Sequence, residues 1–89
     1  MAEFLLELYA SRTDPDAVCR DVKRARTASR ELTREGIPVR FLRSIFVPEN
    51  DMCFLLYEAP TARSVREAAG RAGLVSEGVR RTITGAARR

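Results

Sequence analysis

The sequence predicts a small α+β domain whose elements follow in the order strand, helix, strand, strand, helix, strand. Three observations carry this prediction: short stretches of alternating apolar residues, two stretches with apolar residues at helical spacing, and turn- and cap-forming residues between them. The chain has 89 residues, about the size of one domain, so we expect a single domain over 1–89 with a frayed tail at 85–89. Hydrophobic residues make up 45% and charged residues 31%, a balance that excludes a disordered or collagen-like chain.

The first strand is expected over 3–9, where apolar residues alternate with others. The apolar face of this strand consists of Phe4, Leu6 and Leu8. The first helix is expected to begin after Asp14, which can cap it, with Pro15 in the first helical position. Its apolar stripe at helical spacing consists of Val18, Val22, Ala25, Ser29 and Leu32. Gly36 is a natural stop for this helix.

Two further strands, 39–47 and 52–58, are expected to form a hairpin, because both are rich in apolar residues and a Pro-Glu-Asn-Asp turn separates them. The second helix is expected to begin after Thr61, which can cap it, and to end at Gly73. Its small-residue stripe consists of Val65, Ala68, Ala69 and Ala72. A short β-branched stretch over 79–84 predicts the last strand.

This order of elements is that of the ferredoxin-like fold. Such a fold has a four-stranded antiparallel sheet with both helices on one face. The other face, called the open face below, stays uncovered. We expect function there, with the open face serving as a dimer surface or as a ligand floor, as in proteins of the dimeric α+β barrel type.

Side-chain alternation assigns residues to the open face. Because the set beginning with Phe4 faces the helices, Leu5, Glu7 and Tyr9 are assigned to the open face. In the hairpin two assignments remain, because a shift of one residue reverses every side chain. The first assignment places on the open face Phe41, Arg43, Ile45, Phe54, Leu56 and Glu58. The second places there Leu42, Ser44, Phe46, Cys53, Leu55 and Tyr57.

Under the first assignment the open face is too apolar to be left in water. Its large apolar or aromatic residues are Leu5, Tyr9, Phe41, Ile45, Phe54 and Leu56. An exposed area of this kind marks a protein interface or a ligand groove. We therefore predict a homodimer, and a small-molecule pocket lined by Leu5, Phe41, Ile45, Phe54 and Leu56.

Three ionisable residues, Glu7, Arg43 and Glu58, lie within this apolar face. In one interpretation they form an ion cluster in which both acids share Arg43 and orient the dimer. In a second they form a catalytic site, where Glu7 or Glu58 moves a proton and Tyr9 donates a hydrogen bond to the ligand. In a third, Glu7 and Glu58 supply hard oxygen ligands to a metal ion.

Several classes of site are excluded by composition. The sequence contains no His, which excludes Ser-His-Asp and Cys-His catalysis and every imidazole-dependent metal site. The two cysteines, Cys19 and Cys53, form no CxxC motif, and we expect both to be buried thiols. No apolar run approaches the ~20 residues of a membrane helix, and the start Met1-Ala2-Glu3-Phe4 is not that of a secretory signal. We therefore expect a cytoplasmic protein with no membrane partner.

Positive charge is concentrated at the C-terminal end of a chain whose net charge is +4. The last ten residues contain no acid and four arginines, Arg80, Arg81, Arg88 and Arg89. We interpret them as a solvated tail on a neutral body. A second basic feature is Arg26, Arg30 and Arg34, which recur every four residues and can bind phosphate, although such a row is more often the solvated side of a helix.

The same element order occurs in the RNA-recognition motif, which stacks bases on strand aromatics. That motif opens its third strand with a basic residue and Gly, where this chain has Asn50, Asp51 and Met52. Acids at Glu7 and Glu58 would also repel a phosphate chain. The sequence therefore disfavours a nucleic-acid partner.

Several short motifs resemble those of one small bacterial family. They are Phe4-Leu5-Leu6-Glu7, Phe54-Leu55-Leu56-Tyr57-Glu58-Ala59-Pro60, Ser64-Val65-Arg66-Glu67-Ala68-Ala69 and Arg71-Ala72-Gly73-Leu74. In this order they resemble a family of ferredoxin-like proteins of unknown function that includes nickel-binding members. The resemblance spans about 3–84, nearly the whole chain.

The resemblance implies a ferredoxin-like fold, a dimer and a pocket in the family's position. The resemblance does not imply nickel binding in the same way. Family members often have His on the second helix, where this chain has Ala68, Ala69 and Gly70. We therefore expect no tightly bound cofactor and at most weak divalent-metal binding. Related dimeric α+β proteins are cofactor-free enzymes acting on polyketide-like substrates, which keeps a cyclase or isomerase as the alternative function.

Overall fold

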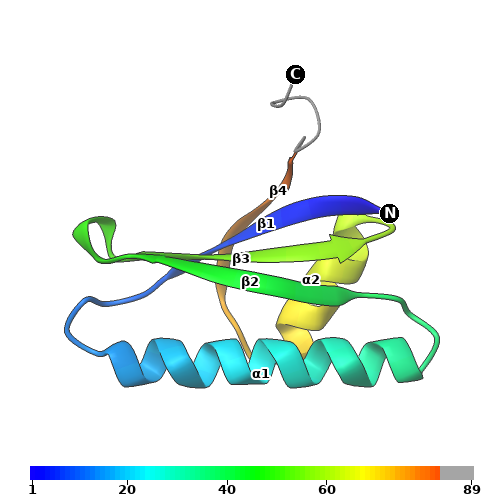
Figure 1. The fold of residues 1–89 in the computed structure, drawn as a ribbon, viewed down its shortest axis with the longest axis horizontal. Helices are drawn as coiled ribbons and strands as arrows, with labels where there is room; N and C mark the ends of the chain where they lie inside the picture. The colour runs from blue at the N-terminus through cyan, green and yellow to red at the C-terminus, as the bar shows by residue number, and fades with distance from the viewer. Residues whose placement is uncertain (83–89) are drawn as a thin grey trace.

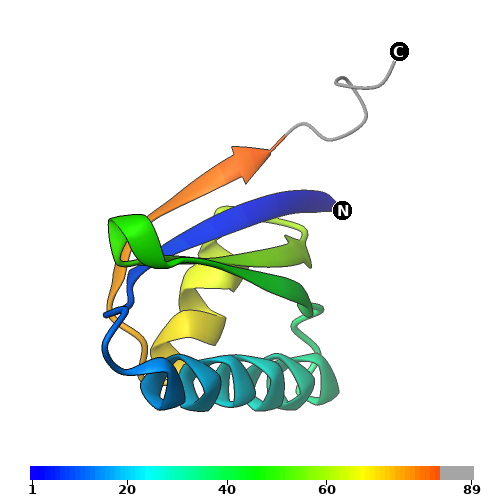
Figure 2. The same ribbon diagram turned by 60° about the vertical axis from the view of Figure 1, so that its left-hand side comes forward.

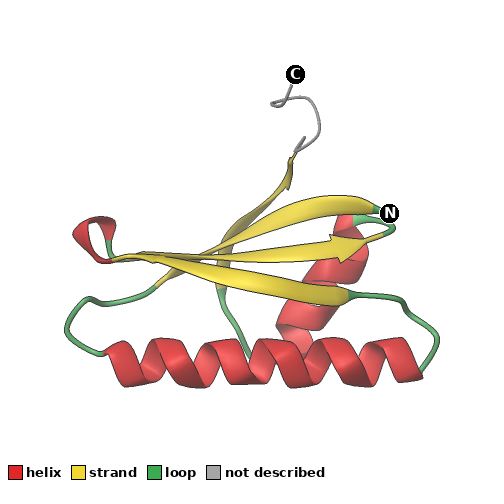
Figure 3. Cartoon of the chain, viewed as in Figure 1, coloured by secondary structure: helices red, strands yellow, loops and turns green. Residues whose placement is uncertain are grey.

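The computed structural model describes residues 1–82, which form one four-stranded sheet with two helices on one face (Figures 1 and 3). The elements are β1 (Ala2–Tyr9), α1 (Pro15–Arg34), β2 (Arg40–Val47), the 3₁₀ turn η1 (Pro48–Asn50), β3 (Met52–Ala59), α2 (Ala62–Arg71) and β4 (Ser76–Thr82). The strand order is β2-β3-β1-β4, and every neighbouring pair is antiparallel. The predicted ferredoxin-like fold is thereby confirmed. The expected tail at 85–89 lies outside the described residues.

The residues predicted to cap the two helices do so in the structure. The Asp14 carboxylate caps α1 by accepting a hydrogen bond from the Ala17 amide at 3.2 Å. The Thr61 hydroxyl caps α2 in the same way, accepting from the Ser64 amide at 3.3 Å. After α1 the chain turns at Gly36, whose φ of +99° is a left-handed conformation that glycine adopts at little cost.

A side-chain clamp fixes the passage from α1 into β2. The Thr33 hydroxyl donates to the Val39 carbonyl at 2.8 Å and accepts from the Val39 amide at 3.2 Å. Both backbone groups of Val39 are therefore satisfied just before β2 begins. The clamp holds the start of β2 against the last turn of α1.

The core lies between the helices and the inner face of the sheet (Figure 2). From β1 it takes Phe4, Leu6 and Leu8, the set predicted to face the helices. From α2 it takes the small residues Val65, Ala68 and Ala69, which let this helix approach the sheet closely. Within residues 1–82, neither helix combines the length and apolar character needed to span a bilayer.

The first of the two hairpin assignments holds for β3. Cys53, Leu55 and Tyr57 are buried under the helices, whereas Phe54, Leu56 and Glu58 lie on the other face. β4 differs from its predicted bounds, because pairing with β1 extends it back to Ser76, which lies opposite Leu8.

A β-bulge overturns the assignment of Phe41. The register passes from Phe41 opposite Tyr57 to Arg43 opposite Leu56, so Leu42 is an extra residue in β2. Phe41 therefore faces the helices, and its ring meets the Tyr57 ring edge-on, with centroids 5.6 Å apart. The prediction that Phe41 lines the open face is wrong. The alternation resumes after the bulge, so Arg43 and Ile45 do lie on the open face.

The two cysteines differ in environment. Cys53 is buried, and its pKa is raised by burial and, less strongly, by the Asp21 carboxylate. Cys19 is exposed on α1, so the expectation that it is buried is wrong. Its neighbour Val18 is the residue that belongs to the apolar stripe, and Val18 packs against the core.

We predict that only Cys19 reacts rapidly with an aromatic disulfide reagent near pH 8. The thiolate is the reacting form, and Cys53 is both enclosed and held protonated. Stopped-flow absorbance should show one fast thiol, with the second appearing on adding urea. Cys19→Ser should remove the fast phase and Cys53→Ala should leave it; two fast thiols in the native wild type would contradict this prediction.

We also predict that Tyr57→Phe stabilises the fold. The Tyr57 hydroxyl is fully buried with no hydrogen-bond partner among residues 1–82, and burial raises its pKa. Removing an unpaired buried hydroxyl should raise the free energy of unfolding by about 1 kcal/mol. Urea denaturation measures this change, with Tyr9→Phe, at an exposed side chain, as the control. A loss of stability in Tyr57→Phe would show that the hydroxyl is bonded in solution.

Candidate functional site

The open face is organised in rows of side chains that lie opposite one another across the strands. Both helices lie on the other side of the sheet, as Figure 2 shows. Cross-strand partners in register share a face. The rows are Arg40–Glu58–Glu3–Thr82, then Arg43–Leu56–Leu5–Arg80, and then Ile45–Phe54–Glu7–Gly78.

The centre of the open face is apolar. Leu5, Phe54 and Leu56 are half-buried there on the two central strands. Ile45 is 42% exposed beside Phe54. Four of the five residues predicted to line a ligand surface thus lie together, and Phe41 is the fifth, which the bulge turns to the helices. Tyr9, 63% exposed, stands at the end of β1, where it borders a depression of ≈380 Å³ with Asp21 and Val75.

Glu7 is the least exposed carboxylate among the ion pairs, with 18% of its side chain exposed. It lies opposite Phe54 on one side and Gly78 on the other, and its carboxylate pairs with the Arg80 guanidinium from β4. Arg80 was interpreted from the sequence as part of a solvated tail, and this interpretation is wrong. The sequence does include Arg80 in the predicted last strand, 79–84, but only the register of β4 against β1, with Gly78 opposite Glu7, brings it beside Glu7.

Glu58 has a different partner. Its carboxylate accepts a hydrogen bond from Arg40 at 3.1 Å, and its backbone lies opposite Glu3. Arg40 is the first residue of β2 and lies just before the bulge. Its role was not predicted from the sequence.

The expected ion cluster of Glu7, Arg43 and Glu58 does not form. Glu58 lies opposite Glu3, four residues from Glu7 along β1, a separation of roughly 13 Å at ~3.3 Å per residue. Each acid pairs with its own arginine, and Arg43 makes no ion pair with residues 1–82. The proposed proton-transfer roles of Glu7 and Glu58 stay predictions, as does the hydrogen-bonding role of Tyr9.

On the open face, the side chains that could hold a metal ion are carboxylates. Among residues 1–82 there is no group of three or more His, Cys, Asp or Glu side chains close enough to hold an ion. The carboxylates that lie in register on the open face are Glu3 and Glu58, and Glu58 is already engaged by Arg40. Glu7 and Glu58, the pair proposed from the sequence, are placed in different rows.

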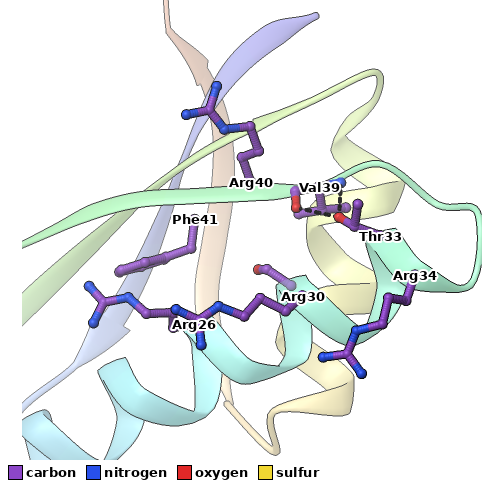
Figure 4. A pocket seen from close by; sticks show the side chains of 8 residues that line it. Arg26, Arg30, Thr33, Arg34, Val39, Arg40 and Phe41 are labelled. Atoms are coloured by element: carbon purple, nitrogen blue, oxygen red, sulfur yellow. Dashed lines mark hydrogen bonds between the residues drawn. The ribbon is translucent and has the colours of Figure 1, made fainter.

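A depression of ≈420 Å³ lies away from the open face, between α1 and β2 (Figure 4). Its lining consists of Arg26, Ser29, Arg30, Thr33, Arg34, Val39, Arg40 and Phe41. The row of arginines noted in the sequence therefore borders a hollow in the surface.

Comparison with known proteins places this chain in a family. The family model described as "Nickel responsive protein SCO4226-like" matches residues 10–81. A crystal structure of SCO4226 from Streptomyces coelicolor A3(2) is similar in fold, with a TM-score of 0.68 and 20% identity over 91% of this chain and 95% of that chain. No curated protein matches the sequence. The resemblance to a small bacterial ferredoxin-like family is confirmed, and this chain belongs to the SCO4226-like family of nickel responsive proteins.

Proposed function

We propose that the protein is a homodimeric binding protein in which two open faces pack together and hold a small ligand between them. The observation that supports this proposal is the apolar centre of the open face, which no element of residues 1–82 covers. Ile45 alone leaves 42% of its surface in water there, next to Phe54. Contiguous apolar surface of this kind is typical of interfaces and ligand sites.

The charges around the apolar centre favour a second copy as the covering partner. The open face carries three acids, Glu3, Glu7 and Glu58, and three arginines, Arg40, Arg43 and Arg80. A twofold dimer brings the same face against itself, so a face with balanced charge can meet its own copy without net repulsion. Arg43, which has no acidic partner within residues 1–82, is free to pair across the interface.

The ligand expected between two such faces combines an apolar body with polar groups. The floor is formed by Leu5, Phe54 and Leu56, and the half-buried Glu7 carboxylate stands at its side. The family description adds a metal, since its members are called nickel responsive. On the open face, nickel would have to use carboxylate oxygens, which bind it less well than imidazole does.

We predict that Ile45→Glu separates the dimer into monomers. Covering the remaining 42% of Ile45 contributes roughly 1 kcal/mol in each protomer. An unpaired carboxylate in its place is costly to desolvate. The dimer dissociation constant should therefore rise by at least about tenfold. Light scattering on a sizing column over a range of concentrations measures it. Val75→Glu is the matched control, because Val75 is 84% exposed in the loop before β4.

Two results would contradict the dimer proposal: a wild-type protein that stays monomeric at high concentration, or equal behaviour of Ile45→Glu and Val75→Glu. Circular dichroism of each variant separates dissociation from unfolding.

We predict that Ni²⁺ binds weakly and through the open face. The double variant Glu3→Gln with Glu58→Gln should abolish the heat of Ni²⁺ binding in a calorimetric titration, because it neutralises the two carboxylates that lie opposite each other on the open face. The matched control is Glu49→Gln with Glu77→Gln, which removes two exposed carboxylates elsewhere. Tight Ni²⁺ binding that survives the Glu3/Glu58 change would place the metal site away from this pair of carboxylates.

A further inference from the structure

The depression between α1 and β2 carries a concentrated positive charge. Arg26, Arg30 and Arg34 line it at intervals of four residues, so their backbone positions lie about 6 Å apart along one side of the helix. None of the three forms an ion pair with residues 1–82, whereas Arg71 on α2 pairs with Glu35 and Glu31. Like charges at this spacing repel one another, which an anion in the depression would relieve.

The lining of the depression includes an unsatisfied hydroxyl. Ser29 lines the depression and is only 2% exposed, and its Oγ has no hydrogen-bond partner among residues 1–82. A buried hydroxyl without a partner costs free energy in the folded protein. An oxygen atom of a ligand bound in the depression would accept a hydrogen bond from the Ser29 hydroxyl. This second observation is independent of the charge.

The walls of the depression are fixed. The Thr33 hydroxyl is hydrogen-bonded to both backbone groups of Val39, so these polar groups are already satisfied and the position of β2 beside α1 is fixed. The Arg26 guanidinium lies over the Phe41 ring, 5.2 Å from its centroid, an arrangement that holds the side chain beside β2 (Figure 4). Arg40 points away from the helix in Figure 4 and is bound to Glu58, so it contributes least.

We propose that this depression, called the arginine groove, binds the di- or triphosphate group of a small molecule. Three guanidinium groups supply charge-assisted, fork-shaped hydrogen-bond donors that match phosphate oxygens. The volume of ≈420 Å³ is within the range of small-ligand sites. One phosphate group needs only part of the row, whereas two or three linked phosphates engage all of it.

A small molecule fits the arginine groove better than a nucleic-acid chain does. A chain of phosphates is bound by basic residues spread over a wide face. Here the row ends with Arg34, and beyond α1 the open face carries Glu3, Glu7 and Glu58. RNA binding is therefore treated as a competing outcome of the test.

Calorimetric titration of the full chain with pyrophosphate and tripolyphosphate at low salt tests the proposal. The double variant Arg30→Gln with Arg34→Gln should weaken binding of both probes by about tenfold or more, because two charge-assisted contacts are lost. The matched control is Arg63→Gln with Arg66→Gln on α2, which changes the net charge equally and leaves the groove intact. Control binding should stay within about threefold of wild type, the loss that long-range charge alone accounts for.

A second variant separates a binding role of Ser29 from a structural one. Ser29→Ala removes a buried unpaired hydroxyl, so the melting temperature of the free protein should rise. The same change should weaken pyrophosphate binding severalfold, a loss that a purely structural residue would not show.

Three results would overturn the proposal. They are no binding of either probe by the wild type, equal losses in the Arg30/Arg34 and Arg63/Arg66 variants, and single-stranded RNA binding far tighter than tripolyphosphate with a steep salt dependence. None of these variants changes an open-face residue, so failure here is distinguishable from failure of the dimer proposal.

Discussion

The two-residue period of β1 and β3 is the constraint on which the rest of the structure depends. It sends Phe4, Leu6 and Leu8 from β1, with Leu55 and Tyr57 from β3, to the helices. Residues 1–82 provide two α-helices, and both cover this inner face (Figure 2). The residues between these positions must then form a second surface, which is part apolar and part charged. The open face is a consequence of the same alternation that builds the core.

Most of the fold could be predicted from the sequence because its signals are local. Asp14 before Pro15 and Thr61 before α2 mark helix starts by chemistry that acts within one turn. The alternation in β1 and β3 fixes which side chains face the helices. The exact start of β4 was missed, because its first residues are held by pairing with β1 and not by their own β-propensity.

The candidate site was predicted less well because it depends on registers between strands distant in sequence. Arg80 meets Glu7 only because β4 pairs with β1 in one particular register, and Arg40 meets Glu58 in the same way across β2 and β3. Nothing local in the sequence distinguishes these arginines from Arg43. Phe41 was misplaced because a bulge leaves no mark in residue type at Leu42. Cys19 was misplaced because it adjoins the apolar stripe of α1 without belonging to it.

The extra residue at Leu42 divides β2 into two parts whose side chains contribute to opposite faces of the sheet. Before it, Phe41 belongs to the helix side, touching Tyr57 and lying under Arg26. After it, Arg43 and Ile45 belong to the open face. If residues 40–47 alternated regularly with no bulge, Phe41 and Ile45 would share one face, and one of the two would be on the wrong side. The bulge thus lets one short strand contribute an aromatic ring to the wall of the arginine groove and an apolar side chain to the opposite surface of the same small domain.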